Sequence, residues 1–555
     1  MRDIILIEKA LRDIVAENGW EWPEKAVLET PKDVKHGDLA TNLAMVLSKQ
    51  AKAAPRVVAE KLMAAVCEKF PGLVTAEIAG PGFINFTFAP SFWQEVILEA
   101  EEQGKAFGSS KNGDGRRIVV EYVSANPTGP LHIGHGRGAA VGDSLTRVLR
   151  FAGFDVSTEY YINDAGRQMR LLGDSVYLRM RELCKLPVEF PEDPKGWYRG
   201  DYIIDIAREM LEKDASVIEL PEEEAKNKCY EYACAQILAG IKDDLNEFRV
   251  EHQVWFSEKS LVDGGKVEEA FDKLRGMGLV YDKDGAVWLA TEQFGDDKDR
   301  VLRKGDGYLT YFASDIAYHD NKYGRGFDET IDIWGADHHG YVPRMKAAIQ
   351  CMGRDPEKDF HVVLIQMVNL MRNGEPVAMS TRAGEFVTLR EVLDDVGADA
   401  ARYMFLSRKS DTPLDFDLEL VKQRSMDNPV YYVQYAHARV AALLRRAADR
   451  GIVLAERSSA DMLACLTSAD DLALLREVER FRNVVEDAAR MRAAHPVSFY
   501  LNELAGRLHS WYANNPVLSG DDEAVMKARL ALLRAVAVVI ANGLDLLGVS
   551  APESM

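Results

Sequence analysis

The sequence predicts a multidomain α/β protein, in which a parallel-sheet domain lies between a small N-terminal α+β domain and a C-terminal all-α helical bundle. The 555 residues exceed one ordinary core, since domains commonly hold about 150 residues. Residues 118–162 run from a strand through a loop and a helix to a second strand, the pattern of a parallel βαβ unit. From about Asp415 onward, apolar residues recur at helical spacing.

The N-terminal α+β domain is predicted over residues 1–110. Apolar residues have helical spacing at residues 4–16, 39–47 and 55–70. Residues 76–88 alternate between apolar and polar like a pair of strands. A run rich in Gly, Ser and Asn follows at residues 108–115, and it predicts the boundary with the next domain.

The central domain, residues 111–414, is predicted to be Rossmann-like, because strands that alternate with helices imply a parallel sheet. Apolar runs typical of buried strands occur at residues 118–123, 156–162, 330–334 and 361–367. A helix is predicted over residues 136–151. The acidic, mostly helical segment from about residue 173 to 290 is interpreted as an insertion into this domain.

The C-terminal domain, residues 415–555, has three long amphipathic segments, residues 472–491, 497–514 and 523–547. The longest apolar run near the C-terminus, residues 535–541, is far below the roughly 18 residues of a membrane span. Six scattered cysteines are too few for a disulfide framework and predict a reducing cytoplasm. Cys229 and Cys234 are a zinc pair or, as we favour, buried apolar residues.

The chain is acidic as a whole. It holds 68 Lys and Arg against 88 Asp and Glu, a formal net charge of −20. Phosphate groups of a nucleic acid need Lys and Arg nearby, so the overall sign counts against such a partner without excluding it. An RNA partner would have to find a local basic surface on this acidic body.

The loop after the first predicted buried strand contains His132, Ile133, Gly134 and His135. A strand ends and a helix begins here, and at such a point backbone N–H groups and the helix dipole favour phosphate. Two histidines one turn apart can donate hydrogen bonds to a phosphate in its transition state. Surface caps or a metal pair are the alternative interpretations of the two rings.

The run from Glu121 to Arg137 resembles the signature loop of class I aminoacyl-tRNA synthetases, and its upstream part resembles that of the arginyl enzymes. Residues 197–202, 334–341 and 548–555 resemble bacterial arginyl-tRNA synthetases in the same order. The signature loop comprises Asn126, Pro127, Thr128, Gly129, Pro130, Leu131, His132, Ile133, Gly134, His135 and Gly136.

The resemblance implies an arginine–tRNA ligase. Such an enzyme activates L-arginine with ATP to arginyl-adenylate and transfers it to the 2′-hydroxyl of the terminal adenosine of tRNA(Arg). The resemblance implies that His132 and His135 act on the α-phosphate of ATP, with Gly134 beside the nucleotide. It places the ATP ribose and adenine near Gly335, Asp337 and His338. A turn rich in capping residues is the alternative for that loop. We expect Mg²⁺ to arrive with ATP and no protein-bound metal.

The family's second, mobile signature loop has Met-Ser at its centre, and Ser380 matches that serine. The family pattern has lysines on both sides, whereas this sequence has Ala378 and Thr381. Some arginyl enzymes compensate with a lysine upstream of the histidines, where this sequence has Gly129. The resemblance assigns Ser380 and Arg382 to catalysis at the leaving pyrophosphate. The candidate cations for that group are Arg382, Arg137, Arg408 and Lys409.

An arginine substrate carries a guanidinium that stays protonated, so its pocket should offer carboxylates. Tyr311 and Asp315 are four residues apart and would share one face of a helix. A helix-surface pair is the alternative. The resemblance places the guanidinium contacts at Glu121, Tyr311 and Asp315, and the α-amino and carboxylate contacts near Ser124 and Asn126.

Both end domains resemble tRNA-binding domains of the family. Residues 31–42 resemble part of the additional domain that contacts the tRNA elbow, and a helix start capped by Asp38 is an equal alternative. The C-terminal bundle resembles the anticodon-binding domain of arginyl and cysteinyl enzymes. Its candidates for stacking on bases or meeting phosphates are Tyr431, Tyr432, Tyr435, Arg439, Arg445, Arg446 and Trp511. A core or solvated position is the more usual one for any single residue of this set.

Three other classes of protein share parts of this pattern. The cysteinyl enzyme shares the bundle but holds its substrate through a zinc site, and the sequence shows no such ligand set. Small nucleotidylyltransferases share the two-histidine loop without the bundle. A catalytically inactive tRNA-binding paralogue is opposed by the complete set of substrate residues. The expected partners are tRNA(Arg), L-arginine and ATP, with no membrane, for a monomeric cytoplasmic enzyme.

Overall fold

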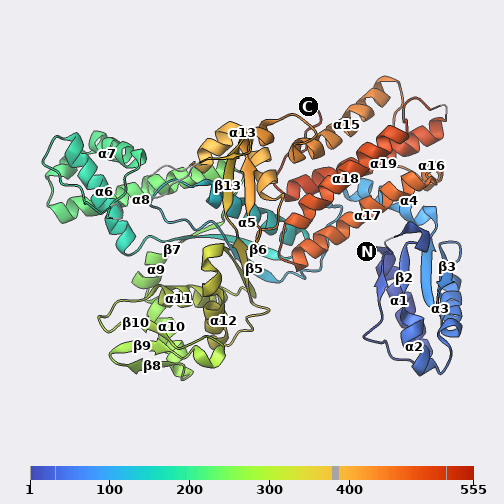
Figure 1. Cartoon of the computed structure of the whole chain (residues 1–555), viewed down its shortest axis with the longest axis horizontal. Coiled ribbons are helices and arrows are strands. Elements are labelled where there is room, and N and C mark those ends of the chain that lie inside the picture. Colours follow the sequence, from blue (N-terminus) through green and yellow to red (C-terminus); the bar gives the residue numbers. More distant parts are fainter. Residues whose placement is uncertain (1, 32, 194–195, 378–386, 521) are drawn as a thin grey trace.

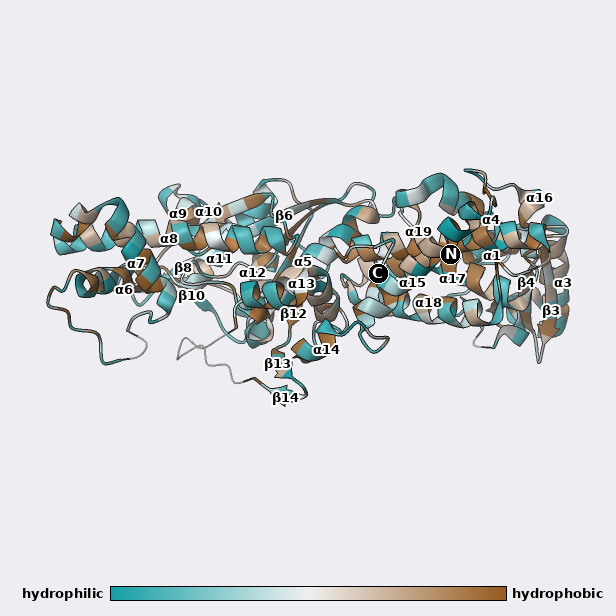
Figure 2. Ribbon diagram, turned by 90° about the horizontal axis from the view of Figure 1, so that it is seen from above, coloured by the Kyte–Doolittle hydropathy of each residue, from teal (hydrophilic) through white to brown (hydrophobic). Residues whose placement is uncertain are grey.

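The computed structural model describes residues 2–31, 33–193, 196–377, 387–520 and 522–555. The molecule is elongated, with the N-terminal domain at one end and a helical arm at the other (Figure 1). The parallel sheet lies between them, beside the C-terminal bundle. Figure 2 shows the same order of parts from a second direction. No helix among the described residues is long and apolar enough to cross a membrane.

The N-terminal domain packs three helices against a four-stranded antiparallel sheet. The helices are α1 (Arg2–Glu17), α2 (Leu43–Ala51) and α3 (Pro55–Lys69). The strands follow the order β1 (Leu28–Glu29), β2 (Leu39–Thr41), β4 (Phe83–Phe88), β3 (Val74–Ala79). The linking helix α4 (Pro90–Gln103) continues toward the bundle and packs on it.

Two predictions in this domain are wrong. Residues 39–47 do not form one helix, because Leu39 and Thr41 are buried on strand β2 and pair with β4 before α2 begins. Asp38 does not cap a helix. Its carboxylate accepts the backbone N–H of Phe88 at 2.8 Å and a hydrogen bond from Arg476 of the bundle at 2.7 Å. Asp38 therefore joins two domains.

The central sheet has five parallel strands in the order β12-β11-β5-β6-β7. The strands are β5 (Arg117–Glu121), β6 (Asp155–Ile162), β7 (Val254–Ser257), β11 (Glu329–Gly335) and β12 (Phe360–Ile365). Helix α5 (Ile133–Phe151) makes the crossover between β5 and β6. The four strands and the helix predicted from the apolar runs are confirmed, and the sheet is parallel as predicted.

The predicted insertion at residues 173–290 is not one insertion, because β7 lies within it and pairs with β6 as an edge strand of the central sheet. The helical arm precedes β7 in the chain. It consists of α6 (Arg167–Leu183), α7 (Asp201–Lys213) and α8 (Glu222–Glu247). After it come α9 (Glu258–Asp263), α10 (Lys266–Gly276) and a three-stranded antiparallel sheet. Those strands are β8 (Val280–Lys283), β9 (Ala286–Leu289) and β10 (Arg300–Arg303). Strand β7 is short and only half-buried, so it produces no long apolar run.

The sequence predicted helices from about Asp415 onward. This prediction is wrong for the first residues of the segment. Strand β15 (Leu414–Asp417) pairs in parallel with β13 (Val368–Arg372), which in turn pairs with β14 (Glu375–Pro376). The bundle then consists of α14 (Leu418–Lys422), α15 (Pro429–Asp449), α16 (Ala460–Leu463), α17 (Ala469–Arg490), α18 (His495–Asn514) and α19 (Glu523–Leu546). The three long predicted helices are confirmed.

The bundle and the sheet domain share one continuous apolar core. At their junction the buried guanidinium of Arg402, on α13 (Leu389–Phe405), donates to the carboxylate of Asp143 on α5 at 2.5 Å. It also donates to the carbonyl oxygens of Leu547 and Phe248 at 2.8 and 2.9 Å. One side chain thus joins α5, the end of the helical arm and the end of α19.

Candidate functional site

The chemistry-bearing loops follow β5 and β11, two neighbouring strands whose carboxyl ends lie at the same edge of the sheet. The loop after β5 carries backbone strain at its start. Val123 and Ser124 have φ angles of 70° and 40°, a region that is uncommon for residues other than glycine and of real cost for a β-branched one. Strain of this kind persists only where the surroundings hold the loop firmly, and it is common at functional sites.

His132 and His135 form a stacked pair at the N-terminus of α5, with ring centroids 3.6 Å apart. Nδ1 of His132 accepts the backbone N–H of Gly134 at 3.1 Å, and Nδ1 of His135 accepts the backbone N–H of His132 at 3.2 Å. Burial lowers the pKa of both rings, to about 3 for His135. Each neutral ring therefore carries its proton on Nε2, and the pair presents two N–H donors.

Asp315 lies on α11 (Tyr311–Gly324), and its carboxylate accepts a hydrogen bond of 2.5 Å from the hydroxyl of Tyr341. Burial raises the pKa of Asp315 above its ordinary value. Tyr311 is on the same helix but is 71% exposed. The hydrogen-bond partner of Asp315 is therefore Tyr341. This residue ends the stretch 334–341, but the sequence did not identify it as a site residue.

Parallel register places three carboxylates side by side across the sheet. Glu121 at the end of β5 lies opposite Asp332 of β11 and Glu159 of β6. All three side chains are buried. Adjacent like charges in a low-dielectric interior are costly, so this row needs cations.

Two of these cations come from α11 and its C-terminal end. Nζ of the fully buried Lys322 donates to Glu121 at 2.7 Å and to Asp332 at 2.9 Å. Burial alone would lower the pKa of Lys322, but Asp332 and Glu121 outweigh it and raise that pKa. Arg325 donates to both carboxylate oxygens of Glu159, at 2.5 and 2.8 Å.

His319 of α11 also contacts this row. Its Nδ1 lies 2.8 Å from the carbonyl oxygen of Asp315, and its Nε2 lies 2.8 Å from the carboxylate of Asp332. Lys322 and His319 lower the pKa of Asp332 against the effect of burial. His319 therefore joins the backbone of α11 to the row of carboxylates, for which Lys322 and Arg325 are the cations.

Other side chains of the predicted arginine site are held by neighbours. Glu121 also accepts a hydrogen bond of 2.9 Å from Ser124, so its two oxygens are shared between Ser124 and Lys322. The side-chain amide of Asn126 donates to Gln168 of the helical arm at 2.8 Å. Near Asp315 lies Glu258, a buried carboxylate whose pKa is raised by burial and which sequence reasoning missed.

Gly335, Asp337 and His338 lie where β11 leads into the short helix η5 (Ala336–Tyr341), beside the strand that carries Glu121. A Cβ atom at Gly335 would lie 2.5 Å from Oδ1 of Asp337, whose side chain is free to turn toward solvent. The side chains of Asp337 and His338 are 82% and 60% exposed and 3.6 Å apart. They are accessible to a ligand at the carboxyl edge of the sheet.

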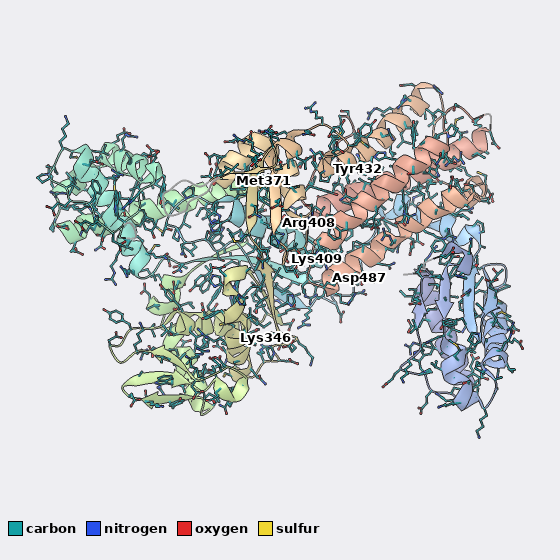
Figure 3. All side chains as sticks on the ribbon, viewed as in Figure 1. Lys346, Met371, Arg408, Lys409, Tyr432 and Asp487 are labelled. Carbon is teal, nitrogen blue, oxygen red and sulfur yellow. The ribbon has the colours of Figure 1, made fainter. Side chains whose placement is uncertain are left out.

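One candidate cation for the pyrophosphate is eliminated. Arg137 is fully buried and donates to the carbonyl oxygens of Gln366 and Lys409, each at 2.9 Å, so it cannot reach a phosphate. Arg408 and Lys409 are exposed and lie near the start of α18, where the sheet domain meets the bundle (Figure 3). The predicted Ser380 and Arg382 lie outside the described residues.

The bundle residues predicted to meet RNA divide into two groups. Trp511 is buried and donates to Asp471 at 3.0 Å, so it takes the core position that was considered the more usual one for a residue of this set. Tyr431 and Tyr435 stack on α15 with ring centroids 5.8 Å apart, and Arg439 lies 4.8 Å from the Tyr435 ring.

Cys229 and Cys234 are buried on α8, as favoured from the sequence. No group of three or more His, Cys, Asp or Glu within the described part of the chain could hold a metal ion.

A parallel sheet with a two-histidine loop at its carboxyl edge, joined to a helical bundle, defines a class I aminoacyl-tRNA synthetase. The family model described as "tRNA synthetases class I (R), catalytic domain" matches residues 97–422. The models "Arginyl tRNA synthetase N terminal domain" and "DALR anticodon binding domain" match residues 5–88 and 433–555. The chain belongs to the arginyl-tRNA synthetase family.

The similarity to individual relatives spans the full length. An arginine–tRNA ligase of Nitratidesulfovibrio vulgaris (strain Hildenborough) is 62% identical over 98% of both chains. That of Lawsonia intracellularis is 50% identical over 100% of both. The arginyl-tRNA synthetase structure of Thermus thermophilus shares the fold, with a TM-score of 0.75, 22% identity and 99% of each chain covered.

The chain is an arginine–tRNA ligase, with L-arginine, ATP and tRNA(Arg) as its substrates. The comparisons give no support to a catalytically inactive paralogue.

Proposed function

We propose that His132 and His135 stabilise the α-phosphate of ATP during arginyl-adenylate formation. The observation that carries this proposal is the pair of Nδ1 acceptor contacts, which commits both neutral rings to donation from Nε2. The arginine carboxylate attacks the α-phosphorus, and negative charge gathers on the phosphate oxygens as pyrophosphate leaves. Donors fixed by backbone contacts stabilise that charge without reorganising at the moment of reaction.

The guanidinium of arginine binds Asp315, with Tyr311 and Glu121 as further contacts. The row of carboxylates is already paired with Lys322 and Arg325. Neither Asp315 nor Glu258 has an ion pair with another described residue, and Asp315 is only partly buried. A charge-assisted contact to a guanidinium contributes about 1.5–3 kcal/mol. Ser124 and Asn126 hold the α-amino and carboxylate groups.

The nucleotide extends from the histidine pair along the carboxyl edge of the sheet. Gly134 allows close approach of the α5 N-terminus, while Gly335, Asp337 and His338 hold the ribose and adenine. Mg²⁺ arrives with ATP, because phosphate oxygens are suited to this ion. The leaving pyrophosphate is met by Ser380 and Arg382, with Arg408 and Lys409 as the remaining candidate cations.

The bundle binds the anticodon arm of tRNA(Arg), and the N-terminal domain contacts its elbow. The stacked Tyr431 and Tyr435, with Arg439 beside them, offer an aromatic and cationic surface suited to loop bases. The N-terminal domain spans residues 1–110, the central domain extends past the expected limit at residue 414 to the end of strand β15, and the bundle follows. The enzyme acts as a cytoplasmic monomer.

The arginine assignment is tested with Asp315→Asn, in the presence of tRNA(Arg). Because the amide keeps the shape but loses the charge, KM for arginine should rise by at least tenfold while KM for ATP changes less than twofold. Asp320→Asn is the matched control, since Asp320 lies on the same helix and contacts Lys273. Equal effects of Asp315→Asn on both KM values would contradict the assignment.

A further inference from the structure

The signature loop depends on side-chain donors from other elements. Between β5 and α5 the backbone forms no helix or strand, so its buried carbonyl groups need partners elsewhere. Three are supplied by side chains. His252 contacts the carbonyl oxygen of Tyr122 at 3.2 Å, Tyr160 donates to that of Ala125 at 2.8 Å, and Tyr202 donates to that of Thr128 at 2.7 Å.

Tyr202 differs from the other two donors in its origin. Tyr160 lies on β6 and His252 lies two residues before β7, so both are parts of the sheet domain. Tyr202 is the second residue of α7, in the helical arm. It belongs to the stretch at residues 197–202, which resembles bacterial arginyl-tRNA synthetases. None of the roles proposed above involves this stretch.

The arm contacts the loop at further points. The hydroxyl of Tyr198 shares a hydrogen bond with the side chain of Thr128. The backbone N–H of Tyr198 donates to Ser175 of α6 at 2.8 Å, which fixes the tyrosine to the arm. Gln168, also on α6, accepts from Asn126. The arm thus contacts two residues of the stretch that leads from the proposed arginine site to the histidine pair.

Two glycines make room for the Tyr202 ring. A Cβ atom at Gly200 would lie 2.4 Å from that ring, and a Cβ atom at Gly129 would lie 3.1 Å from its hydroxyl oxygen. Gly200 has φ −58° and ψ 152°, a conformation open to any residue. Glycine at position 200 is therefore required by the closeness of the tyrosine and not by the backbone.

We propose that Tyr202 is a positioning residue for adenylate formation, through which the helical arm holds the signature loop in the geometry that aligns Asn126 and His132. This inference rests on the roles given above to those two residues. In this proposal Tyr202 does not itself contact a substrate. It acts through the carbonyl of Thr128, which lies between Asn126 and His132 in the chain, and it offsets the tendency of a strained loop to relax.

The test is Tyr202→Phe, which removes one hydroxyl and keeps the ring. Loss of one hydrogen bond to the loop should lower kcat for arginine-dependent ATP–pyrophosphate exchange, with tRNA(Arg) present, by about two- to tenfold. KM for arginine and for ATP should change less than kcat. The matched control is Tyr232→Phe, because Tyr232 lies on the same arm and its hydroxyl contacts only Lys213 and Glu209 among the described residues.

A double-mutant cycle separates positioning from general destabilisation. Gly129→Ala should lower kcat, because the new methyl group presses on the Tyr202 hydroxyl. In the Tyr202→Phe background that hydroxyl is absent, so Gly129→Ala should cost less than it does alone. Strictly additive effects, or an unchanged kcat in Tyr202→Phe, would overturn the proposal.

The outcome is distinguishable from failure of the underlying assignment. If His132→Ala lowers kcat strongly while Tyr202→Phe has no effect, the histidine role stands and the positioning role of the arm is wrong. If His132→Ala has no effect, the histidine role fails whatever Tyr202→Phe does. A loss of about 1 kcal/mol in stability would lower the melting temperature of a large domain by about 2–4 °C. A melting temperature of Tyr202→Phe within about 2 °C of the parent would therefore show that its kcat loss is local.

Discussion

The buried guanidinium of Arg137 donates a hydrogen bond of 2.9 Å to the backbone carbonyl of Lys409. Its second donor group holds the carbonyl of Gln366. Arg137 therefore ties the first turns of α5, where the histidine pair lies, to the segments after β12 and α13. Arg137 was a candidate phosphate ligand in the sequence, but in the fold it joins three segments of the chain. Another cation must therefore balance the charge of the leaving pyrophosphate.

Arg382→Ala should lower kcat for adenylate formation more than tenfold and leave KM for arginine nearly constant. A guanidinium can hold two phosphate oxygens at once, and the contact forms mainly as pyrophosphate leaves. Pyrophosphate exchange measures both quantities. Thr381→Lys in the Arg382→Ala background should restore part of the rate. A silent Arg382→Ala combined with a damaging Lys409→Ala would move the cation out of the loop.

Gly548→Ala should lower the free energy of unfolding by about 2 kcal/mol or more. A Cβ atom there would lie 2.3–2.5 Å from the guanidinium of Arg402, in a backbone with φ 65°. Gly451→Ala is the matched control, because Gly451 has φ 78° and nothing within 4 Å of its added Cβ atom. Denaturant unfolding of both variants measures the difference. Equal losses would show that strain alone, and not the Arg402 junction, requires glycine at position 548.

Lys322→Met should destabilise the fold by about 3–5 kcal/mol, because it leaves the buried carboxylates of Glu121 and Asp332 without their shared cation. Lys346→Met is the comparison, since Lys346 forms an ion pair with Glu357 at the surface. Such exposed pairs contribute about 1 kcal/mol or less. Chemical denaturation distinguishes the two. A Lys322→Met enzyme as stable as the parent would contradict the role of Lys322 as the cation that Glu121 and Asp332 share.

His252→Phe should flatten the acid side of the stability profile. Burial lowers the pKa of His252 to about 4, while the unfolded chain titrates near its ordinary value of 6.5. Between these values the unfolded state binds more protons, so stability is lost as pH falls from 6.5 toward 4, by up to about 1.4 kcal/mol per pH unit. Phenylalanine removes this dependence. Unfolding free energies at pH 7, 6, 5 and 4 measure it, and parallel profiles for both proteins would count against the shifted pKa.

The sequence was sufficient for four of the five strands of the central sheet and for the long helices, because buried runs such as residues 330–334 and the amphipathic helices α17 to α19 carry their own pattern. It was insufficient for β7, which is short and half-buried at a sheet edge. It was also insufficient for Asp38, whose partner Arg476 is in another domain, and for Trp511, whose burial depends on packing between helices.

The site shows the same division. The histidine pair follows from its position between a strand and a helix, and the spacing of Tyr311 and Asp315 is local. The row of Glu121, Glu159 and Asp332 depends on parallel register between strands far apart in the sequence. One signal was available, because each of these acids lies in or at the end of an apolar strand, where a charge needs a partner.

The most direct test of the account is single-turnover formation of arginyl-adenylate by His135→Ala. The neutral ring donates from Nε2 to charge that develops in the transition state, so the rate should fall by about 10²–10³. Arginine binding should stay within twofold. Because the pKa of His135 is about 3, the parent rate should show no loss near pH 6.5 from protonation of this ring. An unaltered rate in His135→Ala would remove the histidine pair from the mechanism.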